Sequence, residues 1–179
     1  MAFVAAIGMV CMTGCTKDDL TNDNNANGGS NGGSNDGSGD ESALVDYFVG
    51  NYSLTVVTDS LGVDGTWFET SYYTEMTGKE EPPRYGRLTI SKIDNQTVKL
   101  YGKVQIGNDS VVYYDTEAQV NSDGQLVLAP CTTAIGDTPQ NFTFSDIDRA
   151  QPLAFRSERH LQMYGMDCGY ILTNTAERQ

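Results

Sequence analysis

Apolar and polar residues alternate along most of the chain beyond residue 50, which is the pattern of a half-buried β-strand. The alternation is strict over 97–106, where Val98 and Leu100 open a series of small or apolar residues separated by polar, charged or Tyr positions. Residues that favour tight turns, such as Asp94 and Asn95, separate several of these stretches. The other strands are expected at 50–58, 65–74, 85–93, 110–120, 125–129, 140–145, 152–157, 159–164 and 167–174.

One segment has the spacing of a helix instead. Over 42–49 the apolar residues fall at positions 44, 45, 48 and 49, which lie on one side of a helix. Ser42 is a favourable N-cap, and Gly50 favours an end after the last turn.

These elements predict an all-β fold with one short N-terminal helix. Eight or nine antiparallel strands at such regular spacing indicate either a β-sandwich or a β-barrel. The uniform succession of hairpins favours an up-and-down β-barrel, because closure of the sheet removes its exposed edges. We expect this domain to occupy residues 42–179.

The N-terminal residues predict export and lipid attachment. The uncharged apolar run 2–12 is too short to span a bilayer and fits a secretion signal. The following residues, Met12 to Cys15, resemble the lipobox of bacterial lipoproteins, in which a signal peptidase cuts before the Cys and the Cys sulfur carries a diacylglycerol. The resemblance implies a signal peptide over 1–14 and lipidation of Cys15.

A tether is expected to connect the lipid to the domain. Residues 15–41 are acidic and rich in Asn, Gly and Ser, so they contain almost nothing that could be buried. Residues 16–19, Thr-Lys-Asp-Asp, resemble the surface-export signal of Bacteroidetes lipoproteins. The resemblance implies an outer-membrane lipoprotein exposed at the cell surface, although the residues leave open which leaflet the domain faces.

A second resemblance concerns the fold. Gly50, Asn51 and Tyr52 open the first strand and resemble the Gly-x-Trp start of the lipocalins and other calycins, whose aromatic residue plugs the floor of the barrel. Together with 86–92 and 97–106, they resemble the lipocalin-like domains of Bacteroidetes lipoproteins over 44–174. The resemblance implies a lipocalin-like barrel and brings no catalytic residues with it.

The net charge of the chain limits the classes of molecule that it is expected to bind. The formal net charge is −13 at pH 7, from 24 acidic and 11 basic residues. A surface of this sign repels phosphate backbones and anionic membranes, which argues against nucleic-acid binding. Contact with a membrane is therefore expected only through the lipid anchor, and a protein partner stays open.

The four cysteines fall into two groups. Cys11 lies in the signal peptide and Cys15 takes the lipid, which leaves Cys131 and Cys168 as one pair in an exported domain. A disulfide between them is expected in an oxidising compartment. Metal binding is the rival interpretation, but no Cys-x-x-Cys is present and His160 is the single histidine, so neither a metal nor a cofactor is expected.

No catalytic constellation is apparent in the sequence. A lone histidine is more often a surface residue than a catalyst, and no nucleophile elbow or phosphate-binding glycine loop occurs. The pairs Asp115/Glu117 and Asp146/Asp148 each share one strand face and keep open a glycoside hydrolase that uses two carboxylates. The protein is nevertheless expected not to be an enzyme.

The aromatic residues suggest binding instead. In a barrel about half of them point inward, where they either fill the core or line a pocket for a small apolar or glycan ligand. We expect the ligand-binding side chains to be Trp67, Tyr73, Tyr113, Phe144 and Tyr164.

The predicted function is thus a lipid-anchored envelope protein that binds a small hydrophobic ligand or an oligosaccharide. A filled barrel would instead favour a structural or protein-interaction role, as an adhesin, complex subunit or inhibitor. Ser60 and Ser110 each follow an Asp and precede an apolar residue, which resembles the Bacteroidetes O-glycosylation signal.

Overall fold

The computed structural model describes residues 41–136 and 138–179 of the chain. The predicted signal peptide and Cys15 lie outside these residues, as does the predicted tether except for Glu41. The helices are α1 (Glu41–Phe48) and α2 (Thr70–Thr77). The strands are β1 (Gly50–Val63), β2 (Thr66–Glu69), β3 (Arg84–Lys92), β4 (Thr97–Ile106), β5 (Asp109–Val120), β6 (Leu126–Leu128), β7 (Cys131–Ile135), β8 (Thr138–Phe144), β9 (Leu153–Met163) and β10 (Met166–Arg178).

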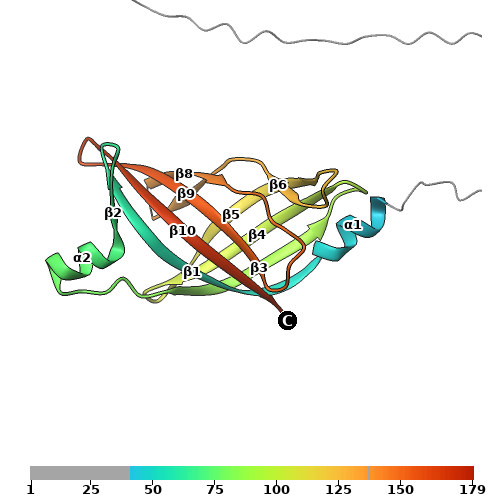
Figure 1. Cartoon of the computed structure of the whole chain (residues 1–179), viewed down its shortest axis with the longest axis horizontal. Helices are drawn as coiled ribbons and strands as arrows, with labels where there is room; N and C mark the ends of the chain where they lie inside the picture. Colours follow the sequence, from blue (N-terminus) through green and yellow to red (C-terminus); the bar gives the residue numbers. More distant parts are fainter. Residues whose placement is uncertain (1–40, 137) are drawn as a thin grey trace, which may run out of the picture. The chain divides into compact units, whose positions relative to one another are not determined.

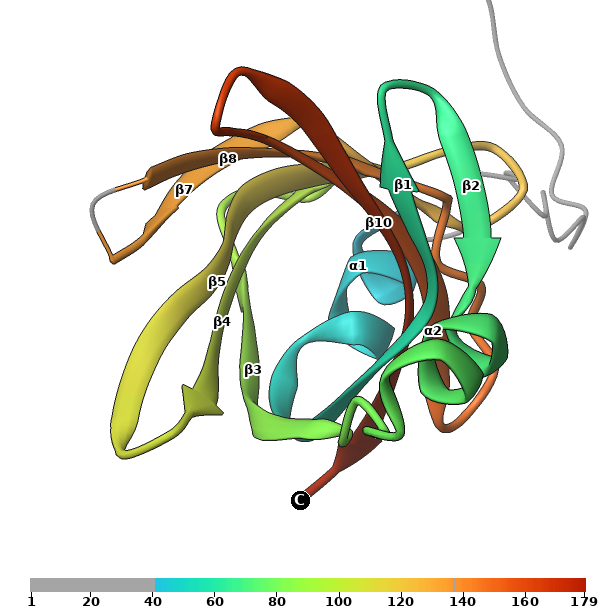
Figure 2. The ribbon, with the colours of Figure 1, turned by 90° about the vertical axis from the view of Figure 1, so that its left-hand side faces the viewer.

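The strands form one antiparallel sheet in the order β6-β5-β4-β3-β1-β10-β9-β8-β7, with β2 paired to β1 beside this path. The first and last long strands are neighbours, in a register that runs from Tyr52 opposite Arg178 to Val63 opposite Cys168. The sheet is strongly curled, with α1 at one end and α2 at the other (Figures 1 and 2). The expectation of a mostly β domain built from one antiparallel sheet is confirmed.

The two strands at the ends of this order are consecutive in the chain. β6 and β7 are separated only by Ala129 and Pro130, and Pro has no N–H to continue a ladder. On its free side β6 makes one bridge, in which Leu126 and Ile147 exchange two backbone hydrogen bonds of 2.9 Å. β7 lies beside β5, and the N–H of Ala129, between β6 and β7, donates to the carbonyl of Glu117 on β5 at 2.9 Å.

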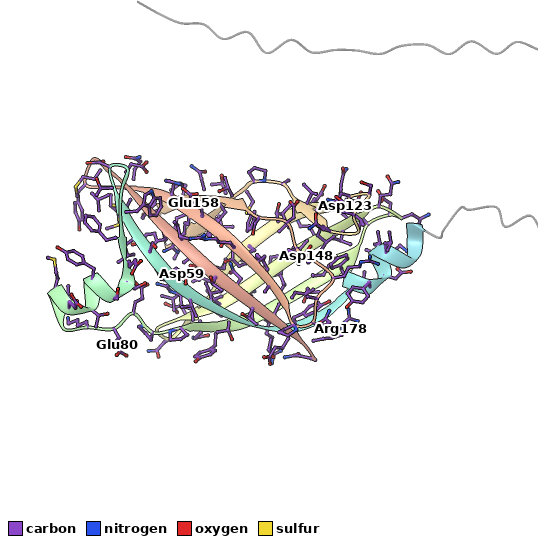
Figure 3. The ribbon with its side chains drawn as sticks, viewed as in Figure 1. Asp59, Glu80, Asp123, Asp148, Glu158 and Arg178 are labelled. Carbon is purple, nitrogen blue, oxygen red and sulfur yellow. The ribbon has the colours of Figure 1, made fainter. Side chains whose placement is uncertain are left out.

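The predicted alternation sets the two faces of the sheet. In β4 the side of Val98, Leu100 and Val104 is buried, while the alternate positions remain exposed or half-buried. The charged side chains labelled in Figure 3 are spread along the length of the sheet and do not gather in one patch. Burial of the inner face supplies the main stabilising term of such a domain.

Side chains fill the middle of the curled sheet. Five aromatic rings pack with centroids 5.0 to 6.1 Å apart, in mostly edge-to-face pairs. They are Tyr113, Tyr114, Phe142, Phe144 and Phe155. The Tyr114 hydroxyl is paired with Asn174 Oδ1 and lies 3.2 Å from Ser157 Oγ, and burial raises its pKa.

The expected strand over 65–74 is wrong in its second half, where the chain forms α2. All four side chains of β2 are exposed, so neither face buries enough apolar surface to extend the strand. The Thr70 hydroxyl lies 2.7 and 2.6 Å from the carbonyl oxygens of Thr58 and Asp59 and ties the start of the helix to β1. Gly78, in the left-handed conformation, ends α2 by donating to the Thr74 carbonyl at 2.8 Å.

Candidate functional site

An apolar pocket opens at the end of the sheet that carries α2, and we call it the mouth pocket. Its volume is about 450 Å³, within the range of small-molecule sites. It lies between the far ends of β1 and β10, the strand β2 and the helix α2. The lining residues are Leu61, Gly62, Val63, Phe68, Tyr72, Met76, Thr77, Cys168, Gly169 and Tyr170.

The hairpin of β1 and β2 positions the aromatic wall of this pocket. Asp64 and Gly65 both have positive φ and form the tight turn, which is a favoured sequence for a hairpin of this kind. Phe68 pairs with Leu61 across the hairpin, whereas Trp67 pairs with Gly62. Because successive side chains of a strand point to opposite faces, Phe68 joins Leu61 at the pocket and Trp67 lies on the other face.

Helix α2 supplies the outer rim of the mouth pocket. The rings of Phe68 and Tyr72 stack with centroids 5.6 Å apart and planes 16° apart. Met76 follows one helical turn after Tyr72, and its side chain is 69% exposed. The rim therefore presents three large apolar side chains to solvent at spacings of four residues.

A buried cation lies one side chain deeper than the pocket. Arg159 is only 6% exposed and lies directly opposite Tyr170 on the neighbouring strand. Its guanidinium carbon is 4.2 Å from the centroid of the Tyr170 ring, a cation–π contact. Its Nη1 donates to the Tyr113 hydroxyl at 2.9 Å. Tyr170 therefore contacts both the pocket, which it lines, and Arg159.

Two buried polar side chains, those of Arg159 and Gln140, are incompletely hydrogen-bonded. Arg159 Nε and Gln140 Oε1 are buried atoms with no hydrogen-bond partner among the described residues. No carboxylate of the described part of the chain forms an ion pair with Arg159. Burial raises the pKa of Tyr113, and the positive charge of Arg159 opposes that rise.

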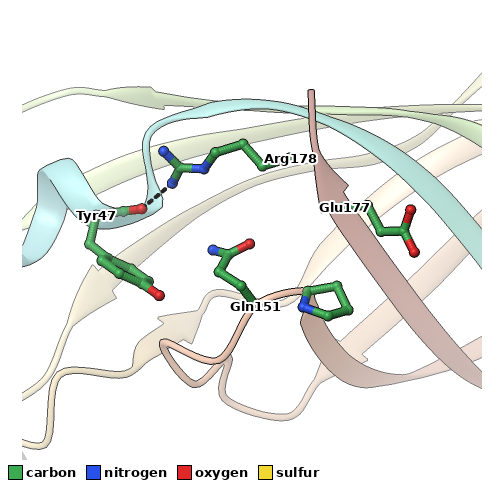
Figure 4. Close-up of a pocket in the computed structure, with 5 residues that line it drawn as sticks. Tyr47, Gln151, Glu177 and Arg178 are labelled. Atoms are coloured by element: carbon green, nitrogen blue, oxygen red, sulfur yellow. Dashed lines mark hydrogen bonds between the residues drawn. The ribbon is translucent and has the colours of Figure 1, made fainter.

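A second hollow, of about 520 Å³, lies at the α1 end and is shown in Figure 4. Arg178 donates to the carbonyl of Tyr47 and, at 3.0 Å, to the hydroxyl of Tyr52. The Tyr47 hydroxyl donates to the carbonyl of Arg149. These contacts tie α1 to β10 and to the loop before β9, so the hollow lies at a structural joint.

The five predicted ligand-binding residues do not meet at one place. Tyr113 lies beneath the mouth pocket, and Phe144 belongs to the packed aromatic cluster. Trp67 covers the opposite face of the sheet, with its ring edge toward His160. Tyr164 is 94% exposed at the turn between β9 and β10. Tyr73 falls within α2, and its side chain lies outside the described part.

The residues that the sequence analysis missed form the pocket itself. Leu61 and Phe68 are equidistant from the Asp64-Gly65 turn, so reading the hairpin as a paired unit would have joined them. Tyr72 and Met76 are spaced as on one side of a helix, but the segment was assigned to a strand. Arg159 shares the inner face of β9 with Phe155 and Leu161.

The predicted disulfide is not formed. Both Cys131 and Cys168 are free thiols. They lie on β7 and β10, with β8 and β9 between them, so three strand spacings of about 4.8 Å put them roughly 14 Å apart along the sheet. A disulfide requires Cα atoms within about 7 Å. Burial also raises the pKa of Cys131, which makes its thiol less reactive.

The remaining candidate groups have ordinary surroundings. Asp115 is ion-paired with Lys99, and Asp148 accepts a hydrogen bond from Gln125. His160 Nε2 lies 2.7 Å from a carboxylate oxygen of Glu158. In residues 41–136 and 138–179, no three His, Cys, Asp or Glu side chains gather as a metal-binding group.

Ser60 and Ser110 lie within β1 and β5, and their glycosylation stays a prediction. Neither helix of the described part has the length and apolar character needed to cross a bilayer. Comparisons of the chain with protein-family models, with curated proteins and with solved structures return no match.

Proposed function

We propose that this protein is a non-enzymatic binding protein that takes a small apolar molecule into the mouth pocket. The observation that carries the proposal is the pocket wall, where Leu61, Phe68, Tyr72 and Met76 leave apolar surface open to water. Contiguous apolar surface around a concavity marks a binding site more often than a structural feature. The scarcity of polar groups in the wall favours a hydrophobic ligand over an oligosaccharide.

The place of binding follows from the packing of the sheet. Tyr113, Tyr114 and Phe142 occupy its middle, so a ligand enters at the mouth and does not pass through the centre.

We propose further that the curled sheet is a closed, filled barrel in which β6 and β7 act as one bent strand. The bridge between Leu126 and Ile147 and the position of β7 beside β5 support this closure.

The lipocalin-like resemblance remains a proposal that the α1 end supports. Tyr52, the aromatic residue of the Gly50-Asn51-Tyr52 motif, is fully buried. Its hydroxyl donates to the Phe48 carbonyl at 2.6 Å, and the Arg178 guanidinium lies 5.4 Å from its ring centroid. A plug of this kind is what the resemblance implies for the floor of the barrel.

A titration with N-phenylnaphthylamine, a neutral apolar dye that fluoresces on leaving water, tests the binding proposal. The full-length chain should bind the dye saturably, and Phe68→Asp should abolish binding because it places a charge in the pocket wall. Ile93→Asp is the matched control, since Ile93 is an exposed apolar residue in the loop between β3 and β4. Equal loss of binding in both variants, or no binding by the parent, would refute the proposal.

Cys168 offers an independent map of the site because it lines the mouth pocket. Alkylation with N-ethylmaleimide, followed peptide by peptide in a mass spectrometer, should slow at Cys168 when the dye is bound. Cys131, on β7, does not line this pocket, and its rate should not change. Protection of Cys131 alone would place the ligand elsewhere.

We also propose that the chain is a lipoprotein held at the bacterial envelope through Cys15, as the lipobox resemblance implies. Expression in a bacterial host with labelled palmitate should label the parent and leave Cys15→Ala unlabelled. Failure of the parent to take up label would remove the anchor from the proposal without affecting ligand binding.

A further inference from the structure

The strongest unexplained feature of the interior is the unpaired charge of Arg159. A guanidinium cannot lose its proton in a protein, so this side chain is a permanent buried cation. Buried cations ordinarily have a carboxylate partner, because removing a charge from water is unfavourable. Among the described residues Arg159 has one hydroxyl and two tyrosine rings as partners, and its Nε has none.

Two tyrosine side chains contact the Arg159 guanidinium, and one of them belongs to the mouth pocket. The Tyr113 ring and hydroxyl occupy one side of the guanidinium, and the Tyr170 ring lies against it at 4.2 Å. Tyr170 is at the same time part of the pocket wall. A molecule that fills the mouth pocket therefore ends one aromatic ring away from an unsatisfied donor.

The Glu81 carboxylate does not serve as the missing partner. Glu81 is paired with Arg84, and both contact the hydroxyl of Thr58, at 3.2 and 3.1 Å respectively. That pair satisfies its own charges at the edge of the site. Within residues 41–136 and 138–179, the cation at Arg159 is thus left without a carboxylate partner.

From this geometry we infer that the ligand of the mouth pocket is an amphipathic carboxylate, whose apolar tail lies between β1, β10 and α2 and whose head group pairs with Arg159. The inference rests on the proposed function, because it names the chemical class of the molecule bound in the same pocket. A planar carboxylate matches the donor geometry of a guanidinium, and the Tyr113 hydroxyl can donate to the same head group.

Binding requires the Tyr170 side chain to turn away from Arg159. The ring then exchanges its cation–π contact for contact with the ligand tail, while the guanidinium gains a charge-assisted hydrogen bond. An alcohol with the same tail fills the pocket equally well but leaves the cation without an anion.

The test compares decanoate with decan-1-ol as competitors of N-phenylnaphthylamine on the full-length chain. The parent should bind decanoate about ten to a hundred times more tightly than the alcohol, as expected for one hydrogen-bonded charge pair. Arg159→Met should bring the two affinities together by weakening decanoate alone. Arg156→Met removes the same charge from an exposed position of β9 and should preserve the difference.

The outcomes separate the two proposals. If neither competitor displaces the dye and the dye itself does not bind, the proposed function fails. If both displace it with equal affinity from the parent, or if Arg159→Met keeps the preference for decanoate, a binding site exists and the carboxylate inference is overturned. If Arg159→Met fails to fold, the comparison of decanoate with decan-1-ol on the parent still tests the carboxylate inference. Arg159→Lys keeps a point charge and should show an intermediate preference for decanoate.

Discussion

At the scale of single residues, two glycines decide where the only tryptophan lies. A Cβ on Gly169 would be 2.5 Å from the Trp67 ring, and one on Gly62 would be 2.9 Å from it. The two glycines lie opposite each other on β1 and β10. Because neither has a side chain, the indole ring can pack directly against the backbone there. Trp67 therefore closes the outer face of the hairpin behind the pocket and does not line it.

Gly169→Ala should lower the free energy of unfolding by about 1–2 kcal/mol, because the added methyl group overlaps the indole. Denaturant unfolding followed by circular dichroism measures this change, also in variants that lack Trp67. Gly50→Ala is the control, since a Cβ there makes only ordinary contacts of 3.5 Å or more. In a Trp67→Leu background the penalty of Gly169→Ala should shrink, and an unchanged penalty would contradict the explanation.

Asp94 should make the turn after β3 sensitive to acid. Its Oδ1 accepts hydrogen bonds from the backbone N–H groups of Gln96 and Thr97 at 2.8 and 2.7 Å, and these bonds lower the pKa of Asp94. A carboxylate with a lowered pKa stabilises the fold above its unfolded pKa, about 3.9, and loses this effect as the pH falls through the folded value.

Asp94→Asn should therefore flatten the decline of the melting temperature below about pH 4, because the amide keeps an acceptor but does not titrate. Thermal unfolding followed by circular dichroism between pH 2 and pH 7 would measure the effect. Asp123→Asn removes a charge from the turn between β5 and β6 and serves as the control. Identical acid profiles for the parent and Asp94→Asn would rule out this role.

At the scale of elements, α2 differs most from the strands around it. Its attachment to β1 rests on the Thr70 hydroxyl, and its end rests on Gly78 at a φ of 67°. Met76 and Tyr72 stay largely exposed, so the helix buries little apolar surface of its own. Elements of this kind open locally more readily than the core of a sheet.

Gly78→Ala should loosen α2 by about 1 kcal/mol, because an alanine is unfavourable at positive φ. Amide hydrogen exchange should become faster over 70–77 while β4 and β10 keep their protection. The affinity for N-phenylnaphthylamine should fall in the same variant, because α2 forms the rim of the mouth pocket. Gly78→Asn should have a smaller effect, since Asn tolerates this conformation better.

The same elements show how far the sequence could predict the structure. β4 and β5 were predicted nearly to their bounds, because strict alternation leaves one choice of buried face. α2 was missed because Thr and Tyr side chains suit a strand locally, and only the lack of burial on β2 decides otherwise. The separation of Cys131 from Cys168 depends on strand order, which spacing along the chain does not reveal.

The candidate site was harder to predict than the fold. Tyr113 was predicted to bind the ligand and is buried, and its partner Arg159 stands in a run of charged residues that looks exposed when read locally. Its burial follows from the two-residue period of β9, in which Leu153, Phe155 and Leu161 share its face. The pairing of β9 with β10, which joins Arg159 to Tyr170, is a long-range contact.

At the scale of the whole molecule, the pairing of β1 with β10 joins the first and the last strand of the described chain. Arg178 strengthens this junction by contacting Tyr47 on α1 and Tyr52 on β1. Because the junction unites residues far apart in the sequence, its formation carries the loop-closure entropy of a long-range contact.

Arg178→Ala should destabilise the domain by about 1–3 kcal/mol, because it removes hydrogen bonds from a charged donor and the cation–π contact with Tyr52. Arg87→Ala, at an exposed position of β3, is the control and should change stability by less than about 0.5 kcal/mol. Chemical denaturation of both variants measures the difference. A loss equal to that of the control would show that the junction is held by the sheet alone.

The pairing of β1 with β10 also determines where the ends of the described chain lie relative to the mouth pocket. Helix α1 leads into the beginning of β1, and β10 finishes beside the same part of the molecule, opposite the entrance between β2 and α2 (Figure 1). A surface or molecule attached at either end of the described domain would thus leave the entrance of the mouth pocket open to solvent. A dye or resin coupled at Gln179 should accordingly report on uptake of a guest molecule without obstructing it.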